Sequence, residues 1–390
     1  MDGKEGMTMN KVRVMFVFGT RPEAIKLAPV IRKAKQRKKQ METSVVVTAQ
    51  HRQMLDDVMD AFGIHPDRDL NIMLPNQSLF HLTSRIIKAM ESVIHELNPH
   101  VLVVQGDTTT TFAAALSGFY AGKKIAHVEA GLRTGHKKEP FPEEINRKMT
   151  STVTDFHFAP TESAKQNLLK EGYDESMIHI TGNTVIDALL WMIADVKEKP
   201  CPISELASIF DHYPVFVLIT GHRRESFGRP LRRIFTAFKE LSRQNPDVAF
   251  IYPVHMNPNV QGPASELLTD LPNFFLFPPL PYSAFCWLMD RCHFIITDSG
   301  GIQEEAPALG KPVLVTRQVT ERPEAVREGM VKLVGNNKEA ILQGAQKLLK
   351  DKGFYRSMVK GYSPYGDGKA ADRILDVILK GKRGRATVTY

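Results

Sequence analysis

The sequence predicts an α/β protein with two doubly wound, parallel-sheet domains and a ligand-binding cleft between them. Short apolar runs alternate with longer amphipathic stretches, and the same alternation begins again after residue 210. Most of these runs are apolar throughout rather than at every second residue, which is typical of parallel strands covered on both faces. Glycine-containing loops follow several of the runs, as in sheets that bind ligands beyond the carboxyl ends of their strands.

Each half of the chain contains its own series of expected strands. In the first half the runs lie at residues 12–18, 45–48, 101–104, 125–128 and 156–159. In the second half they lie at residues 215–219, 248–252, 274–277, 294–297, 313–315 and 332–334. We expect two separate sheets, because helical patterns follow the runs in both halves.

The length of 390 residues exceeds what one hydrophobic core usually supports. We expect an N-terminal Rossmann-like domain at residues 1–190 and a C-terminal one at residues 191–368. The polar, proline-containing segment 197–202 is expected to link the two halves. Loops at 19–21, 106–107, 129–131, 221–222 and 298–301 follow expected strands. Ligand is therefore expected at these loops, in the cleft between the domains.

The segment TDSGGIQEEAPALGKP at 297–312 carries the strongest functional signal. A strand ends there and a helix begins, and Gly300 and Gly301 allow a ligand close to the backbone. The free amides and the dipole at a helix start favour negative charge, so this turn is expected to hold a phosphate. Glu304 and Glu305, expected in the first helical turn, could accept hydrogen bonds from ribose hydroxyls. The segment thus predicts a nucleotide diphosphate site, with a purely structural turn as the alternative.

Composition argues against several classes of protein. No window approaches the roughly 18 apolar residues of a membrane span, and residues 1–10 have no apolar core of a signal peptide. Cys201, Cys286 and Cys292 form no metal-binding pattern and are interpreted as structural or incidental. We therefore expect a cytoplasmic protein with neither a metal nor a membrane partner.

The net charge of +8 is also a weak guide to partners, because much of the excess lies in 32–39 and 380–385. These segments are interpreted as a solvated helix face and a tail, and nucleic acid is not an expected partner. The letters GDGKAA at 366–371 match a dinucleotide fingerprint, but they follow no strand and leave no room for a βαβ unit. They are expected to form a turn before the last helix, and no cofactor is expected.

Nine ordered segments resemble the non-hydrolysing UDP-N-acetylglucosamine 2-epimerases. They are FGTRPEAIKLAPV at 18–30, TAQHRQML at 48–55, QGDTTTT at 105–111, HVEAGLRT at 127–134, PFPEEINR at 140–147, ITGNTVIDALL at 180–190, TGHRRESFG at 220–228, DSGGIQEEAPALGKPVLV at 298–315 and TERPEA at 320–325. The resemblance implies a glycosyltransferase-B-like fold, a helix at 369–390 that crosses back to the first domain, and a homodimer.

The resemblance also implies a reaction: reversible conversion of UDP-N-acetylglucosamine (UDP-GlcNAc) to UDP-N-acetylmannosamine (UDP-ManNAc), for cell-surface polysaccharide synthesis. The C2 hydrogen of the sugar lies beside an acetal carbon, so it cannot leave as an enolisable proton. The family expels UDP, forms a 2-acetamidoglucal and adds UDP back, without NAD. The site must therefore neutralise phosphate charge and place acid and base groups on the sugar.

By the same resemblance, the expected catalytic residues are Asp107, Glu129, Glu143 and His222. Which carboxylate handles which proton is left open. Asp107 and Glu143 could instead be helix caps, and His222 could be a hydrogen-bonded surface residue.

The resemblance implies two further sets of residues. The expected substrate contacts are Arg21, Lys26, Phe285, Ser299, Gly300, Gly301, Glu305 and Arg322. Lys26 could instead be a surface charge and Phe285 a core residue, and Leu280 stands where some relatives have glutamine. A second, activating UDP-GlcNAc is expected at Gln50, Gln53, Gln77, Arg223 and His255, with Asn76 where some relatives have arginine.

Three other functions share some of these features. A glycosyltransferase would use the same fold and phosphate turn but would need an acceptor. A hydrolysing epimerase would release free N-acetylmannosamine and UDP. A sensor without catalytic activity would bind the nucleotide sugar and leave it unchanged.

Overall fold

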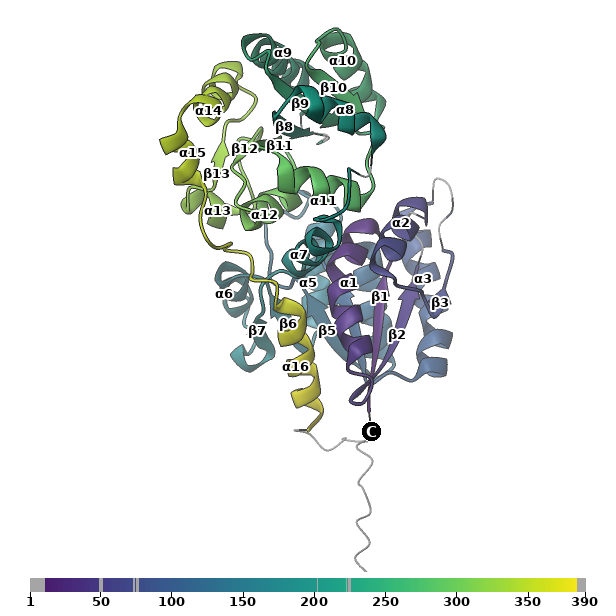
Figure 1. The fold of residues 1–390 in the computed structure, drawn as a ribbon. Coiled ribbons are helices and arrows are strands. Elements are labelled where there is room, and N and C mark those ends of the chain that lie inside the picture. Colours follow the sequence, from purple (N-terminus) through teal and green to yellow (C-terminus); the bar gives the residue numbers. More distant parts are fainter. Residues whose placement is uncertain are drawn as a thin grey trace, which may run out of the picture. The chain divides into compact units, whose positions relative to one another are not determined.

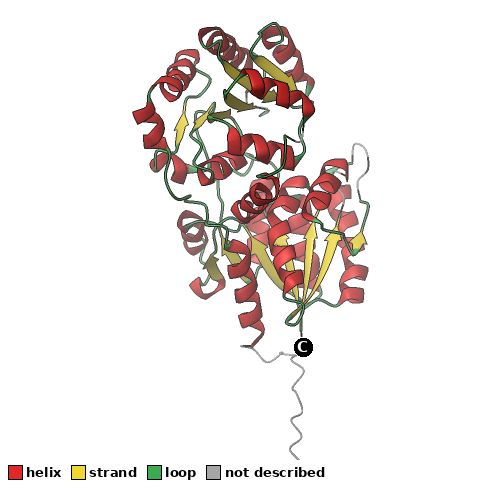
Figure 2. Cartoon of the chain, viewed as in Figure 1, coloured by secondary structure: helices red, strands yellow, loops and turns green. Residues whose placement is uncertain are grey.

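The computed structural model describes residues 11–48, 52–72, 74, 77–201, 203–221, 223 and 226–383, and omits the side chains of 52–54, 382 and 383. The chain forms two compact units, Met1–Ala188 with Gly368–Tyr390 and Leu189–Asp367. Each contains one all-parallel sheet. Figure 1 shows the course of the chain, and Figure 2 shows the helices around the strands of each unit. The predicted fold class is confirmed.

The sheet of the first unit has seven strands in the order β3-β2-β1-β4-β5-β6-β7. The strands are β1 (Val12–Phe18), β2 (Met41–Val47), β3 (Arg68–Asp69), β4 (Val101–Gln105), β5 (Lys124–Val128), β6 (Phe156–Ala159) and β7 (Ile178–Ile180). The chain moves outward from β1 to β3 and then returns to the other side of β1 with β4. The loops after β1 and β4 therefore lie where the strand order reverses, which is where such sheets bind ligands.

The helices of the first unit connect these strands and cover the sheet. They are α1 (Arg21–Gln36), α2 (Arg52–Phe62), α3 (Leu79–Leu97), α4 (Thr109–Tyr120), α5 (Glu143–Thr152), α6 (Glu162–Lys170), the short η1 (Glu175–Met177), the first part of α7 (Thr184–Val196) and α16 (Ala370–Arg383).

The last helix, α16, belongs to the first unit although it follows the second in sequence (Figure 1). It packs on α1, where Arg37 pairs with Asp376 at 2.5 Å and Lys33 pairs with Asp372 at 3.0 Å. Its first amides, those of Ala370 and Ala371, donate to the Asp187 carboxylate at 3.2 and 2.9 Å. Of the GDGKAA pattern, residues 366–369 precede this helix, and Ala370 and Ala371 are its first two residues.

The sheet of the second unit has six strands in the order β10-β9-β8-β11-β12-β13. The strands are β8 (Val215–Thr220), β9 (Val248–Pro253), β10 (Phe274–Phe277), β11 (Phe294–Thr297), β12 (Val313–Val315) and β13 (Val331–Leu333). The helices are the rest of α7, then α8 (Ser204–His212), α9 (Arg229–Gln244), α10 (Pro258–Leu268), α11 (Tyr282–Arg291), α12 (Gly300–Ala308), α13 (Pro323–Arg327), α14 (Lys338–Lys350) and α15 (Lys352–Met358).

The apolar runs at 101–104 and 294–297 form strands whose residues are buried on both faces of the sheet, as the sequence pattern predicts. All five residues of β4 and all four of β11 are buried, as expected for strands covered by helices on both faces. Two short strands were not predicted, β3 and β7. The boundary between the units falls inside α7, so the polar segment at 197–201 lies within the second unit. Of the described helices, none has the length and apolar character needed to cross a membrane.

Candidate active site

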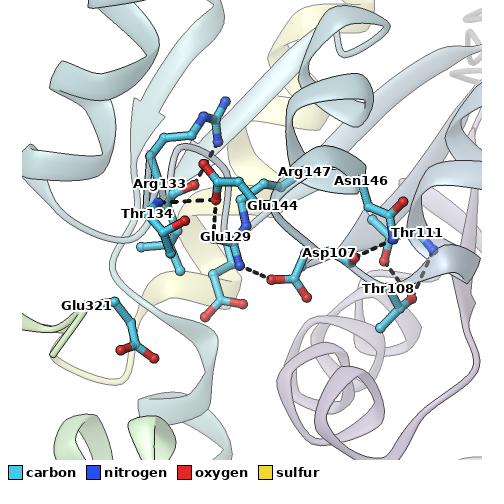
Figure 3. Close-up of polar contacts among 12 residues, drawn as sticks. Asp107, Thr108, Thr111, Glu129, Arg133, Thr134, Glu144, Asn146, Arg147 and Glu321 are labelled. Atoms are coloured by element: carbon cyan, nitrogen blue, oxygen red, sulfur yellow. Dashed lines mark hydrogen bonds and ion pairs between the residues drawn. The ribbon is translucent and has the colours of Figure 1, made fainter. Parts of the chain in front are cut away.

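The loops after β4 and β5 carry two of the expected catalytic carboxylates. Gly106 has a φ of +73°, and Glu129 has a φ of +67°, which is uncommon for a residue with a side chain. A Cβ on Gly106 would lie 3.6 Å from Glu129 Oε2, so the Glu129 carboxylate passes close to the residue before Asp107. Figure 3 shows the side chains of Asp107 and Glu129. Such backbone conformations persist where the surrounding contacts hold them, often at functional sites.

Three donors from separate parts of the first unit hold the Glu129 side chain. Lys26 Nζ lies 2.5 Å from Glu129 Oε1, and Asn183 Nδ2 donates to the same oxygen at 3.0 Å. Gln105 Nε2 donates to Oε2 at 2.5 Å. The Lys26 and Glu129 side chains are only 15% and 6% exposed, so Lys26 is not the surface charge considered above. These three contacts hold the Glu129 side chain in one orientation.

Asp107 forms an ion pair with Arg147, and the Asn146 side chain donates to the Asp107 carbonyl at 3.0 Å (Figure 3). The cap of α4 is Thr108, whose hydroxyl accepts from the Thr111 amide at 3.1 Å. The alternative that Asp107 is the helix cap is therefore wrong. Its carboxylate is 30% exposed and can reach a ligand.

The adjacent residues Glu143 and Glu144 have different surroundings. Glu144 is 1% exposed and accepts hydrogen bonds from the amides of Thr134 and Gly135 at 3.1 and 3.2 Å and from Arg147 at 2.9 Å. In contrast, Glu143 Oε2 is buried without a hydrogen-bond partner among the described residues. Glu143 is the first residue of α5 and does not cap it. Glu144 therefore holds the 134–135 loop, while Glu143 has a buried oxygen without a hydrogen-bond partner among the described residues.

A neutral histidine supports the turn that carries Asp107. His127 is completely buried, and its Nε2 lies 2.7 Å from the Gly106 carbonyl. Since a carbonyl can only accept, this nitrogen carries the hydrogen. Burial lowers the pKa of His127 to about 4, so the ring is neutral at pH 7. It is a structural support rather than a proton carrier.

In the second unit, the predicted strand-turn-helix is present, because β11 ends at Thr297 and α12 begins at Gly300. Ser299 precedes Gly300, the first residue of α12, and its side chain makes no capping hydrogen bond. The Ser299 amide donates to the Thr297 hydroxyl at 2.9 Å. A Cβ on Gly300 would lie 3.2 Å from the Arg322 guanidinium carbon, so this guanidinium rests directly on the helix start. Positive charge and helix amides therefore meet at one point.

Glu321 gathers three arginines beside this turn. Its carboxylate lies 2.9 Å from Arg322, 2.8 Å from Arg317 and 3.3 Å from Arg223. Burial by itself would raise the pKa of Glu321, but the three guanidinium groups outweigh it and lower the pKa to about 2. The side chain is therefore ionised at any physiological pH.

The two glutamates of α12 differ from the expectation. They are the fifth and sixth helical residues and lie beyond the first turn. Glu304 accepts from Arg322 at 2.7 Å, and Glu305 accepts from the Tyr282 hydroxyl at 3.2 Å. The side chain of Glu304 therefore orients Arg322, which makes Glu305 the better candidate for a ribose contact.

The other expected site residues are only partly described. Arg21 is half-buried at the start of α1, and Phe285 is half-buried on α11. For the expected activator site, Gln77 is half-buried, His255 is exposed, and Arg223 pairs with Glu321. His222, Gln50, Asn76 and the Gln53 side chain lie outside the described part of the chain.

Several residues at the site were not predicted. They are Gln105, Arg147, Asn183 and Glu321, and each lies in one of the nine segments quoted above. The signal that could have found them is their position. Gln105 directly follows the strand predicted at 101–104, and Arg147 lies four residues after Glu143. Within the ranges that the structure describes, no group of three or more His, Cys, Asp or Glu side chains is arranged to hold a metal ion.

Comparison with known proteins shows the family. A family model described as UDP-N-acetylglucosamine 2-epimerase matches residues 33–379. The UDP-N-acetylglucosamine 2-epimerase of Campylobacter jejuni is 49% identical over 380 residues, which are 96% of this chain and 99% of that protein. The same enzyme of Escherichia coli K12 is 49% identical over 370 residues, covering 94% and 98%.

Solved structures agree with this result. The UDP-GlcNAc 2-epimerase from Neisseria meningitidis bound to UDP-GlcNAc is 45% identical, with a TM-score of 0.87 over 95% of this chain and 100% of that chain. A glycosyltransferase from Rickettsia africae ESF-5 has a TM-score of 0.57 over 96% and 97% of the two chains at 15% identity, which shows a shared fold alone. The predicted family is thus confirmed, and the chain belongs to the UDP-N-acetylglucosamine 2-epimerases.

Proposed function

We propose that this protein interconverts UDP-GlcNAc and UDP-ManNAc at C2 without hydrolysing the nucleotide sugar. The observation that carries the proposal is the set of three unlike carboxylates in the first unit. Glu129 is held by three donors, Asp107 is paired with Arg147, and Glu143 has an oxygen without a hydrogen-bond partner among the described residues. Epimerisation at C2 needs both a proton acceptor and stabilisation of positive charge near C1.

The reaction proceeds in two steps. The C1–O bond breaks and its electron pair leaves with UDP, and the C2 proton passes to a base, which gives a 2-acetamidoglucal. A proton then returns to the opposite face of C2, and UDP attacks C1 to restore the bond. The fixed, ionised Glu129 suits stabilisation of the cationic transition states, and Asp107 and Glu143 are the candidates for proton transfer. His222 is assigned to the same machinery on its sequence position.

The second unit would bind the UDP part of the same substrate. The free amides at the start of α12 and the guanidinium of Arg322 suit the diphosphate, and Glu305 suits the ribose. Arg21 and Phe285 are further proposed substrate contacts, for the diphosphate and the base. Since UDP leaves and returns, the site must hold it between the two steps.

Proton NMR in D₂O tests the proposal. The protein is incubated with UDP-GlcNAc, without NAD or added metal, and the C2 hydrogen and the products are followed. We expect deuterium at C2, formation of UDP-ManNAc and little free sugar. Free N-acetylmannosamine and UDP in equal amounts would instead identify a hydrolysing enzyme. Bound UDP-GlcNAc that stays unlabelled would contradict catalysis and support a sensor.

Two further proposals follow from the family resemblance. A second UDP-GlcNAc would activate the enzyme by binding near Gln77, Arg223 and His255, together with Gln50 and Gln53. If purified UDP-ManNAc is converted at the same rate with and without added UDP-GlcNAc, this proposal is wrong. The protein is also proposed to be cytoplasmic and to act as a homodimer. Analytical ultracentrifugation of the purified chain would check the dimer.

A further inference from the structure

Glu23 is a buried carboxylate with an unusual number of hydrogen bonds. It is the third residue of α1 and is 1% exposed. Its Oε2 accepts from the amides of Gly19 and Thr20 at 3.1 and 2.8 Å and from the Thr20 hydroxyl at 2.7 Å. Its Oε1 lies 2.8 Å from the Thr108 hydroxyl and 3.1 Å from the Thr111 hydroxyl. None of the ion pairs that the described residues form includes Glu23.

A helix cap accounts for only half of these contacts. In a capping box, the third helical residue returns a hydrogen bond to the amide before the helix, and Glu23 does this for Thr20. Its second oxygen, however, reaches Thr108 and Thr111, which are 85 and 88 positions away in sequence. Glu23 thus connects the loop after β1 to the loop after β4, on the two strands between which the strand order reverses.

Stability does not explain why this residue is a carboxylate. Burial raises the pKa of Glu23 despite the hydrogen bonds, so the fold disfavours its charged form. A neutral side chain of the same shape would avoid this cost. Buried polar groups that lower stability are found mainly where function requires them.

We propose that Glu23 is a positioning residue that sets the loop of Arg21 against the loop of Asp107. Thr20 directly precedes Arg21, and Thr108 directly follows Asp107, so the two oxygens of one carboxylate define the spacing of two proposed functional side chains. The inference rests on the proposed function, because it concerns the same reaction. Glu23 itself would touch neither the substrate nor the reacting atoms.

The test uses a substitution that preserves the cap. In Glu23→Gln, the amide oxygen can still accept from Gly19 and Thr20, since glutamine also serves in capping boxes. Its amide nitrogen, however, donates where the carboxylate oxygen accepted, so the Thr108 and Thr111 hydroxyls can keep these contacts only by turning from donors to acceptors. We expect kcat to fall about 10- to 100-fold, because small displacements of reacting groups have effects of this size. The Tm should stay unchanged or rise.

A second variant approaches the same contact from the other side. Thr111→Val removes one hydroxyl from a completely buried position and keeps the side-chain shape. Thr110→Val is the matched control, since Thr110 is equally buried on the same helix but contacts Thr48 instead. We expect lower kcat in Thr111→Val and unchanged kcat in Thr110→Val. The Thr111 hydroxyl also lies 2.6 Å from the Gln105 carbonyl oxygen, so Thr111→Val removes that contact as well. The contact shared with Glu23 should therefore show as a double-variant effect smaller than the product of the two single effects.

The outcomes separate this inference from the function on which it rests. If wild-type protein turns over UDP-GlcNAc and Glu23→Gln matches it in kcat and KM, Glu23 is a helix cap only and the inference is overturned. The same conclusion follows if the effects of the two variants simply multiply. A wild-type protein that binds UDP-GlcNAc but does not epimerise it would overturn both the function and the inference.

Discussion

Replacement of Lys26 by methionine tests the central contact of the first unit. Lys26 Nζ lies 2.5 Å from Glu129 Oε1, and the two side chains are 15% and 6% exposed. Methionine would leave a buried carboxylate without its cation. Loss of one partner of a buried ion pair costs about 3–5 kcal/mol. Gln105 and Asn183 would still donate to Glu129 and offset part of this cost. We therefore expect the free energy of unfolding to fall by about 2–4 kcal/mol.

This loss should be visible in thermal unfolding. For a unit of this size, a loss of about 1 kcal/mol corresponds to a fall of about 2–4 °C, so Tm should fall by about 4–16 °C. Circular dichroism at pH 7 would measure the change, and NMR turnover of UDP-GlcNAc would show loss of activity. Lys33→Met is the matched control on the same helix. Lys33 pairs with Asp372, and the two side chains are 47% and 39% exposed. We therefore expect the free energy of unfolding to change by less than about 1 kcal/mol.

A double variant distinguishes loss of charge balance from loss of packing. Glu129→Gln combined with Lys26→Met removes both charges, and replacement of both partners of a buried pair is often close to neutral. We expect most of the stability to return while activity stays absent. An unchanged Tm in Lys26→Met, or a double variant that is as unstable as the single one, would refute the reasoning.

Three further predictions concern stability. Gly131→Ala should lower the free energy of unfolding, measured by urea denaturation, by about 2 kcal/mol or more beyond the effect of Gly172→Ala. Both glycines have a φ of +88°. Of the two, only Gly131 would bring a new Cβ against backbone, 2.2 Å from the Ala164 carbonyl oxygen. His157→Leu should raise Tm more at pH 5 than at pH 8. Burial, the largest cause, lowers the pKa of His157 to about 3 in the folded protein. The wild type therefore loses stability as pH falls below about 6.5, the pKa of histidine in the unfolded chain. Glu321→Gln should lower the free energy of unfolding by about 2 kcal/mol at pH 7. The difference between wild type and variant should shrink between pH 4.5 and 2, because the pKa of Glu321 is about 2 in the folded protein and higher in the unfolded chain.

Most of the fold followed from local sequence patterns. The runs at 12–18, 156–159 and 294–297 coincide with β1, β6 and β11. The two missed strands have only two and three residues, and both residues of β3 are exposed. Such short edge strands have no apolar run of their own, because pairing with a neighbour, rather than burial, defines them.

Sequence motifs supplied candidate positions for the site, but not the contacts that their side chains make. The family resemblance selected Glu143, but nothing in the sequence assigned a role to Glu144. In the structure Glu144 holds a loop, while Glu143 has an oxygen without a hydrogen-bond partner among the described residues. The partners of Glu129 were also hidden, since Gln105 and Asn183 lie 24 and 54 positions away from it. Side chains that meet through the fold have no common local pattern.

The sequence by itself determined the α/β class, the two parallel sheets, the strand-turn-helix segment around 298–301 and the family, because these features depend on local periodicity, glycine placement and short ordered motifs. Only the tertiary structure decided which charges are paired. It placed Lys26 on Glu129, Arg147 on Asp107 and three arginines on Glu321. The physical reason is that the charge state and orientation of a carboxylate depend on burial and on nearby donors, which distant segments supply only after folding.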